Sequence, residues 1–338
     1  MHILWKNVIF AMRYLIYSGN YLKSKGMNVK NNLSRRGFLQ SASCLSAAAV
    51  LAPFSAEGKE KTRLRNTRKK PDFTLWQIPS HSDTIGNSYV FQTKEGKVIV
   101  MDGGFEEEAF TLRGFIGALG NEVEAWFISH PHSDHMGALN KILKDPQDLK
   151  IKRIFHSRLS EAVTDAEPGS AALCREFYKQ LDVLKDIEVV DMQKPGEVFR
   201  FDGMNVKVLG IANEYTTNPY NNSSTILRVW DRSKSIVFLG DAGVECGDKV
   251  LNGPFRDDLN CEYLQMAHHG QQGCSEEFYR SIRFRACLWP TPTWVWNNNQ
   301  GKGFNTGNLK TVETRSWMDR LKIQEHHVSC LEGLYKLC

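Results

Sequence analysis

Three histidines and one aspartate lie within six consecutive residues of the sequence, in the run HPHSDH at positions 130–135. Imidazole nitrogens and carboxylate oxygens are good ligands for Zn²⁺ and similar divalent ions. Residues two apart in an extended loop point the same way, so His130 and His132 can share one ion. Asp134 and His135 can turn toward a second ion. Four such side chains so close together are rare by chance, and the run therefore predicts a metal-binding loop.

Two more candidate ligand groups follow apolar runs farther along the chain. Asp241 comes directly after such a run, where a carboxylate at a strand end can bridge two ions. His268 and His269 stand at the end of the run 263–267. Asp241 alone would be interpreted as a turn residue. With the first cluster in place, we expect it to bridge the ions.

The elements that must position these residues are visible as apolar runs. The runs 87–92 and 97–101 are separated by Lys-Glu-Gly and predict a β-hairpin. A short buried strand is expected at 125–129, followed by the metal loop at 130–137. A helix is then expected from 138–143.

The wider pattern places strands first, then strands alternating with helices, and then repeats this order. It predicts two sheets packed face to face with helices outside. The last segment, 326–337, is expected to form a terminal hairpin. No linker rich in proline or glycine divides residues 71–338, so we expect them to form one α/β domain.

The motif order resembles the metallo-β-lactamase superfamily over roughly residues 73–338. In that family, His-x-His-x-Asp-His is followed by Gly-Asp and then by a His at a strand end. Asp102, in Val-Met-Asp-Gly-Gly, is similar to the family's first motif, whose Asp orients the metal loop without binding metal. The resemblance implies the four-layer αββα sandwich of that fold. Three further stretches resemble the ComEC-like hydrolase domain subgroup: 221–227, 238–241 and 266–270.

The resemblance also implies a ligand set. The first metal site would take His130, His132 and Asp241, and the second Asp134, His135, Asp241 and His268. His268 is expected to be the ligand and His269 the substrate-side group, although the two are adjacent and the order stays open. Well-known members of the family have a further His that completes the first site. This chain has no His at that place, because His156 lies too early in the chain to fill it. Asn221–Ser224 occupies roughly its place, so the first site is expected to bind more weakly, and mononuclear forms are expected too.

The implied cofactor is one or two divalent ions, with zinc favoured and manganese as the alternative. Such an ion lowers the pKa of water from about 15.7 to about 7, and the resulting hydroxide would attack a carbon or phosphorus atom. Asp134 would orient this nucleophile or accept its proton. Asn221, Ser224 and His269 are candidate donors to the substrate anion, although Asn and Ser stretches more often form turns.

The expected function is hydrolysis of a phosphodiester or a small ester. The alternatives are a lactamase or lactonase-type hydrolase and a non-catalytic metal-binding protein that retains the fold. Residues 1–70 hold 14 Lys and Arg against two acidic residues, so residues 71–338 carry a net charge of about −7 out of the overall +5. This acidic balance argues against a groove for long nucleic acid and favours a small-molecule or nucleotide-type substrate.

Residues 1–56 are interpreted as an upstream extension and an export signal. The stretch 34–40, Ser-Arg-Arg-Gly-Phe-Leu-Gln, resembles the twin-arginine motif, and 41–56 is Ala-rich and ends in a small-x-small cleavage pattern. Met27 is expected to be the initiator. Residues 57–70 form a basic linker. We therefore expect a periplasmic or otherwise extracytoplasmic protein that uses the twin-arginine machinery and has no transmembrane span in its mature chain.

The cysteines do not predict a disulfide framework. The chain has eight, without a CxxC pair, and Cys44 falls in the expected signal. Seven remain, an odd number, so we expect buried free thiols.

Overall fold

The computed structural model describes residues 70–338. The expected extension, the export signal and residues 57–69 of the basic linker lie outside these residues. Among the described residues, no helix has the length and apolar character needed to cross a membrane. The seven cysteines in this part are free thiols; four are buried and only Cys338 is exposed.

The first sheet has eight strands in the order β15-β1-β2-β3-β4-β6-β7, with β5 paired to β4. The hairpin expected at 87–101 is confirmed as the antiparallel pair β2–β3, and Gly96, with φ of 94°, lies in its turn. From β3 to β7 the neighbours run parallel, so their carboxyl ends meet at one edge. The strands are β1 (Phe73–Gln77), β2 (Ser88–Thr93), β3 (Val98–Asp102), β4 (Glu122–Phe127), β5 (Lys150–Ile151), β6 (Arg153–His156), β7 (Glu188–Asp191) and β15 (Tyr335–Leu337).

The second sheet has seven strands in the order β14-β13-β12-β11-β10-β9-β8. Strands β8 to β11 are antiparallel neighbours, and β11 to β14 run parallel. The strands are β8 (Val198–Phe201), β9 (Met204–Gly210), β10 (Ile226–Trp230), β11 (Ser235–Phe238), β12 (Tyr263–Gln265), β13 (Ala286–Trp289) and β14 (Glu325–Val328).

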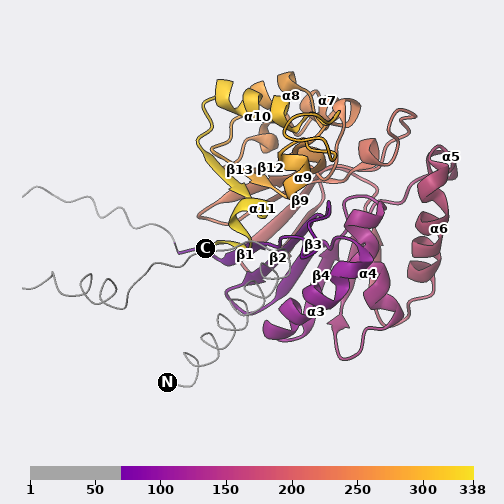
Figure 1. Ribbon diagram of the computed structural model, residues 1–338. Coiled ribbons are helices and arrows are strands. Elements are labelled where there is room, and N and C mark those ends of the chain that lie inside the picture. The colour runs from indigo at the N-terminus through magenta and orange to yellow at the C-terminus, as the bar shows by residue number, and fades with distance from the viewer. Residues whose placement is uncertain (1–69) are drawn as a thin grey trace, which may run out of the picture. The chain divides into compact units, whose positions relative to one another are not determined.

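Helices cover the outer face of each sheet (Figure 1). On the first sheet they are α3 (Ala109–Ala118), α4 (Ser133–Lys144) and α6 (Pro168–Asp182), with the short α5 (Glu161–Asp165) before α6. On the second sheet they are α7 (Val244–Leu251), α8 (Glu276–Arg280) and α10 (Thr311–Arg320). The remaining short turns are η1 (Glu106–Glu108), η2 (Asn221–Ser223), η3 (Arg256–Leu259), η4 (Ala267–Gly270), α9 (Thr293–Trp296) and α11 (Ser329–Glu332).

Three buried hydrophobic clusters mark the boundaries between four layers. The central cluster lies between the sheets, where Phe155 contacts Phe199 with ring centroids 4.6 Å apart and Tyr89 contacts Phe238 at 4.9 Å. The other two clusters lie between each sheet and its helices. The expected αββα sandwich is therefore confirmed, and the alternation of inward and outward side chains along the strands explains it.

Two expectations about elements are wrong. Helix α4 begins at Ser133, not at residue 138, so Asp134 and His135 lie in its first turn. The terminal hairpin does not form, because β14 pairs parallel to β13 in the second sheet and β15 pairs antiparallel to β1 in the first. Gly333, with φ of 70°, follows α11 between the two strands, a conformation that favours glycine.

Candidate metal centre

Asp102, the last residue of β3, fixes the start of the metal loop. Its Oδ1 accepts the backbone N–H of Ser129 at 2.7 Å. Its Oδ2 accepts the Ser129 hydroxyl at 2.8 Å, the side-chain amide of Asn87 at 2.7 Å and Nδ1 of His135 at 2.9 Å. Asp102 is 2% exposed, so these hydrogen bonds satisfy the acceptor oxygens of a buried carboxylate. The carboxylate orients the loop, as the resemblance implied.

Helix α4 presents two candidate ligands in its first turn. Asp134 and His135 are both buried, and the apolar residues of the same helix pack against the first sheet. Gly137 allows the helix to approach η1 closely, because a Cβ there would lie 2.8 Å from the backbone nitrogen of Glu106. The close packing of α4 thus sets the position of its first turn.

Asp241 stands in a turn that requires glycine before it. Gly240 has φ of 55°, and a Cβ at this position would lie 2.9 Å from Cβ of Ser129 and 3.0 Å from Oγ of Ser224. The backbone N–H of Asp241 donates to Oγ of Ser224 at 3.0 Å. Gln265 accepts the N–H of Leu239 at 2.7 Å, which ties this turn to β12. Asp241 is therefore held rigidly against the metal loop.

The two adjacent histidines occupy strained backbone. His268 and His269 both have positive φ, 52° and 55°, which is uncommon for residues other than glycine. This turn directs Nε2 of His269 inward, while its Nδ1 donates to the carbonyl of Pro290 at 3.1 Å. His268 instead donates from Nδ1 to the carbonyl of Gln272 at 3.1 Å. The structure places His269 inside the site, fully buried, and His268 at its edge with 24% of its side chain exposed.

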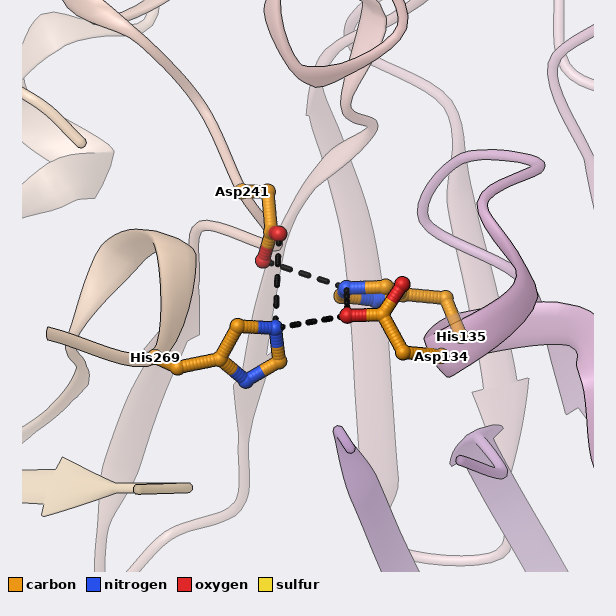
Figure 2. Close-up of side chains that lie close together, drawn as sticks. All are labelled: Asp134, His135, Asp241 and His269. Atoms are coloured by element: carbon orange, nitrogen blue, oxygen red, sulfur yellow. Dashed lines mark hydrogen bonds and ion pairs between the residues drawn. The ribbon is translucent and has the colours of Figure 1, made fainter. Parts of the chain in front are cut away.

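Four of these side chains converge on one point (Figure 2). One ligand atom from each lies within 4.8 Å of all the others. Nε2 of His269 is 3.0 Å from Oδ2 of Asp134 and 3.4 Å from Oδ2 of Asp241, and Nε2 of His135 is 3.2 Å from Oδ1 of Asp241. The members are Asp134, His135, Asp241 and His269.

The donor set fits a divalent cation. Nε2 of His135 and Oδ1 of Asp241 are buried and have no hydrogen-bond partner among the residues that the structure describes. Buried polar atoms without partners are costly, and an ion between them would satisfy both. Two carboxylates and two imidazoles within one sphere are also a common donor set for zinc.

The electrostatics of the cluster favour positive charge. Burial lowers the pKa of His269, but the charge of Asp241 and the hydrogen bond to Asp134 raise it to about 9. Burial also lowers the pKa of His135, yet Asp241 and Asp134 raise it well above its usual value. Burial raises the pKa of Asp134, and the charge of His135 holds it below its usual range. The site therefore attracts cations, whether protons or a metal ion.

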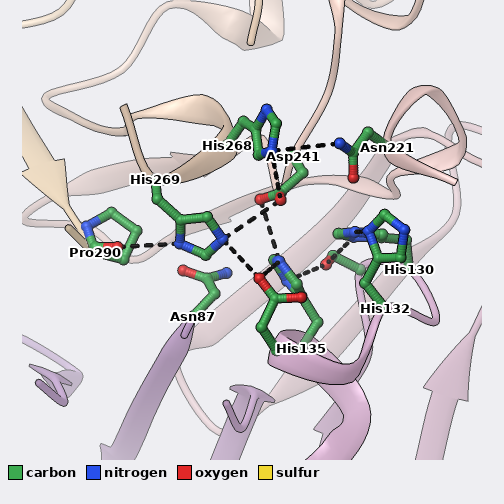
Figure 3. Close-up of polar contacts among 12 residues, drawn as sticks. Asn87, His130, His132, His135, Asn221, Asp241, His268, His269 and Pro290 are labelled. Atoms are coloured by element: carbon green, nitrogen blue, oxygen red, sulfur yellow. Dashed lines mark hydrogen bonds and ion pairs between the residues drawn. The ribbon is translucent and has the colours of Figure 1, made fainter. Parts of the chain in front are cut away.

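His130 and His132 form a neighbouring pair (Figure 3). Nε2 of His130 lies 2.9 Å from Nδ1 of His132. The rings of His130 and His135 are 4.1 Å apart between centroids, so the pair adjoins the four-residue cluster. Burial and then the charge of His135 hold the pKa of His130 well below its usual value. No third histidine joins the pair within residues 70–338, as the sequence indicated.

Asn221 and Ser224 lie beside the cluster but differ in role. The amide nitrogen of Asn221 is 3.4 Å from Nε2 of His268, and its buried Oδ1 lacks a partner in the described region. Ser224 is 0% exposed, and its hydroxyl accepts from Asp241 and lies 3.3 Å from Nδ1 of His130. Because Ser224 is enclosed, it positions Asp241 and His130, and the expectation that it faces substrate is corrected.

The structure places the two adjacent histidines differently from the expected order. His269, expected on the substrate side, lies in the four-residue cluster, whereas His268, expected to be the ligand, lies at the edge of the cluster with its Nε2 3.8 Å from Oδ2 of Asp241. Sequence spacing could not separate them, since only the backbone turn decides which ring points inward.

Several residues that shape the site were not found from the sequence. None of these residues belongs to a sequence motif that indicates a role in the site. The one signal that the sequence offered for any of them was Asn87, which stands next to Ser88, the residue that pairs with Asp102 in the hairpin. These residues are Asn87, Ser129, Glu167 and Pro290.

His156, which lies too early in the chain to complete the first site, and Trp289 both have structural positions. His156 ends β6, is 3% exposed, and its Nδ1 has no partner in the described part of the chain. Trp289 is fully buried and packs edge-on against Trp296 at 5.3 Å, so it belongs to the core behind the site.

The comparisons with known proteins agree with this architecture. The family model described as the metallo-beta-lactamase superfamily matches residues 81–268, more than half of the chain. No curated protein matches. Among solved structures, the chain is similar to the metallo-beta-lactamase fold protein YhfI from Bacillus subtilis. The identity is 13%, the alignment covers 78% of this chain and 99% of that one, and the TM-score is 0.50.

A second solved structure is a mutant of the CmlA beta-hydroxylase. It has 13% identity and a TM-score of 0.49, with 80% of this chain covered. The chain spans about half of that protein's length, 54%. At such identities a structural likeness speaks to the fold alone. The family model, together with the four-layer sandwich, the orienting Asp102 and the converging His and Asp side chains, shows that the chain belongs to the metallo-beta-lactamase superfamily.

Proposed function

We propose that the protein is a metal-dependent hydrolase whose tightest ion is held by the cluster of Asp134, His135, Asp241 and His269. The convergence of four ligand atoms within 4.8 Å carries this proposal. These atoms come from three separate elements: α4, the turn after β11 and η4. An ion there would join segments that lie more than 100 residues apart.

The outer contacts of both histidines support a ligand role. Nδ1 of His135 donates to Asp102, and Nδ1 of His269 donates to the carbonyl of Pro290. Each ring nitrogen that faces the cluster is then Nε2, with its lone pair directed inward in the neutral ring. Carboxylate and carbonyl acceptors of this kind fix the tautomer and orientation of metal-binding histidines.

A divalent ion, with zinc favoured over manganese, would supply a Lewis acid and lower the pKa of water. Asp134 is the more exposed of the two carboxylates, with 9% of its side chain accessible against 2% for Asp241. It therefore fits the role of orienting the water nucleophile and holding its proton. Asp241 is enclosed and fits a purely ligating role.

We place the substrate side of the site at His268, which has 24% of its side chain exposed, and at Asn221, whose amide nitrogen lies 3.4 Å from Nε2 of His268. We propose that these groups meet the anion of a phosphodiester or a small ester. The ComEC-like resemblance supports a phosphodiester, and the acidic balance of residues 71–338 supports a small substrate over a long nucleic acid.

Metal content and turnover, measured on one preparation, test the proposal. Purified protein is analysed by inductively coupled plasma mass spectrometry and assayed with bis-p-nitrophenyl phosphate, p-nitrophenyl esters, a lactone and a β-lactam. We expect bound zinc or manganese and turnover of the phosphodiester or the ester. Asp241→Asn should lose both metal and activity, whereas Asp148→Asn, an exposed aspartate on the α4–β5 connection, should keep both.

The other outcomes discriminate between the alternatives. Stoichiometric metal without turnover of any substrate would favour a metal-binding protein that has kept the fold. Turnover limited to the β-lactam or the lactone would replace the proposed substrate class. A metal-free wild type that is inert toward the whole panel would contradict the proposal outright.

We also propose that the protein is exported by the twin-arginine machinery. The motif at residues 34–40 and the Ala-rich stretch after it support this, and both lie outside the described residues. Replacing Arg35 and Arg36 with lysine should leave the protein in the cytoplasmic fraction of a bacterium that has this machinery. Equal export of the variant would contradict the proposal.

A further inference from the structure

His132 contacts a second side chain on the side of its ring that faces away from His130. Its Nε2 lies 2.6 Å from Oε1 of Glu167, while its Nδ1 lies 2.9 Å from Nε2 of His130. A carboxylate only accepts hydrogen bonds, so the proton of the neutral His132 ring resides on Nε2. Nδ1 then carries the lone pair and faces its neighbour. This arrangement suits a histidine that binds a cation through Nδ1.

The same logic holds for the other member of the pair. Nδ1 of His130 lies 3.1 Å from Oγ of Ser129, whose own proton is donated to Asp102. The hydroxyl oxygen can therefore accept from Nδ1 of His130, which leaves the lone pair of that ring on Nε2. Both facing nitrogens can thus present lone pairs to one ion, and without an ion they would repel each other.

Glu167 is itself held in place by its own segment. It is the residue before α6, a helix of 15 residues, with Pro168 at the first helical position. The Ser170 hydroxyl donates to Oε1 of Glu167 at 2.7 Å. An acidic side chain at a helix N-terminus is stabilised by the helix dipole. The connection between α5 and α6 therefore holds the carboxylate of Glu167 in a fixed position at the edge of the site.

The ring of Tyr220 supports His132 from a third direction. The two rings stack with centroids 5.2 Å apart and planes at 24°, and the Tyr220 hydroxyl donates to the carbonyl of Thr164 at 3.1 Å. Tyr220 precedes η2, and its hydrogen bond to Thr164 ties it to α5, the helix before the segment that carries Glu167. His132 is oriented by hydrogen bonding on one edge and by stacking on one face.

We propose that Glu167 is a positioning residue that fixes the Nε2–H tautomer of His132 and so strengthens ion binding at the pair of His130 and His132, the weaker site that the family resemblance implies. The proposal rests on the proposed function only in the ion-binding role of this pair. The pair lacks a third histidine, so its affinity depends strongly on how well its two rings are pre-oriented. An outer carboxylate that orients a ligating histidine commonly contributes about 10- to 100-fold in metal affinity.

This role is tested by two measurements that do not depend on catalytic turnover. The tautomer of His132 is read from ¹⁵N chemical shifts of the ring in chelator-stripped protein at alkaline pH, and zinc binding is titrated against a chromophoric chelator. In the wild type we expect the Nε2–H tautomer and two zinc affinities. Glu167→Met keeps the side-chain length without an acceptor, and should mix the tautomers and weaken only the lower affinity, by about 10- to 100-fold.

Two further variants separate positioning from general disturbance. Glu167→Gln keeps an oxygen acceptor and should restore most of the tautomer preference. Glu161→Gln lies on α5, with 83% of its side chain exposed, and should behave as the wild type. An unchanged tautomer and unchanged lower zinc affinity in Glu167→Met would overturn the proposal, as would a wild-type His132 ring protonated on Nδ1. A wild type that binds zinc but hydrolyses nothing would instead count against the hydrolase function alone.

Discussion

Nδ1 of His135 lies 2.9 Å from Oδ2 of Asp102, so the last residue of β3 is bonded directly to the first turn of α4. The same carboxylate accepts from Asn87 and twice from Ser129. One buried acid thus links the β2–β3 hairpin, the metal loop and a proposed ligand. The position of the site depends on this residue although it is not a member of the four-residue cluster.

Asp102→Asn should weaken metal binding without removing any ligand. The amide NH₂ must replace one acceptor oxygen and will face at least one buried donor. We expect zinc affinity to fall by about 10- to 100-fold and the free energy of unfolding to fall by about 1–3 kcal/mol. Chelator competition and urea unfolding measure the two effects. Asp148→Asn, at an exposed position, is the matched control, and equal behaviour of the two variants would contradict the role of Asp102.

Gly240→Ala should disturb the turn that carries Asp241. Both the positive φ and the contact of the new Cβ with Ser129 oppose the substitution. We expect a loss of about 1–3 kcal/mol in the free energy of unfolding, together with weaker zinc binding. Gly96→Ala has a similar positive φ, 94°, with nothing within 4 Å of the added Cβ, so it isolates the backbone cost. If the two variants lose equal stability and neither loses zinc, the close approach to Ser129 is unimportant.

Phe127→Ala tests the packing of the two sheets against each other. The ring is 1% exposed and meets Phe201 of the second sheet edge-on, with centroids 6.2 Å apart. Removing such a ring from a core typically costs about 3–5 kcal/mol. Phe304→Ala removes a ring that is 63% exposed, and should change stability little. Denaturant unfolding compares them, and similar midpoints would argue against the sandwich.

His156 should make the folded protein sensitive to acid. Burial, as the largest cause, lowers its pKa from 6.5 to about 4. Below pH 6.5 His156 becomes protonated in the unfolded chain, whereas in the folded protein it stays neutral until the pH falls to about 4. This contribution to stability is therefore complete above pH 6.5 and is lost as pH falls, by about 2 kcal/mol at about pH 5.

The variant His156→Gln removes this titration. Its free energy of unfolding should fall less than that of the wild type between neutral pH and about pH 5. Urea unfolding of both proteins at the two pH values measures the difference. Parallel losses in wild type and variant would show that His156 does not titrate in this range.

The sequence predicted those features that local patterns encode. The β2–β3 hairpin followed from two apolar runs and a short turn with Gly96. The metal loop followed from ligand side chains packed into one short run. Asp241 was recognised only in combination with that run. For the hairpin and the metal loop the signal lies within a few consecutive residues, whereas Asp241 needed a run more than 100 residues away.

Features that depend on distant contacts were missed or misplaced. The strands at 325–328 and 335–337 join different sheets, and spacing alone cannot choose between a hairpin and two separate partners. His268 and His269 have identical side chains, so only their left-handed backbone turn decides which one faces Asp134. Glu167 supports His132 from 35 residues away and belongs to no recognisable motif.

A crystal structure of the zinc-loaded protein, with data collected across the zinc absorption edge, tests the central claim most directly. We predict an anomalous peak at about 2.0–2.2 Å from the inward atoms of Asp134, His135, Asp241 and His269. The absence of a peak beside these four residues at saturating zinc would contradict the account, whereas an additional peak beside His130 and His132 would agree with the second, weaker site.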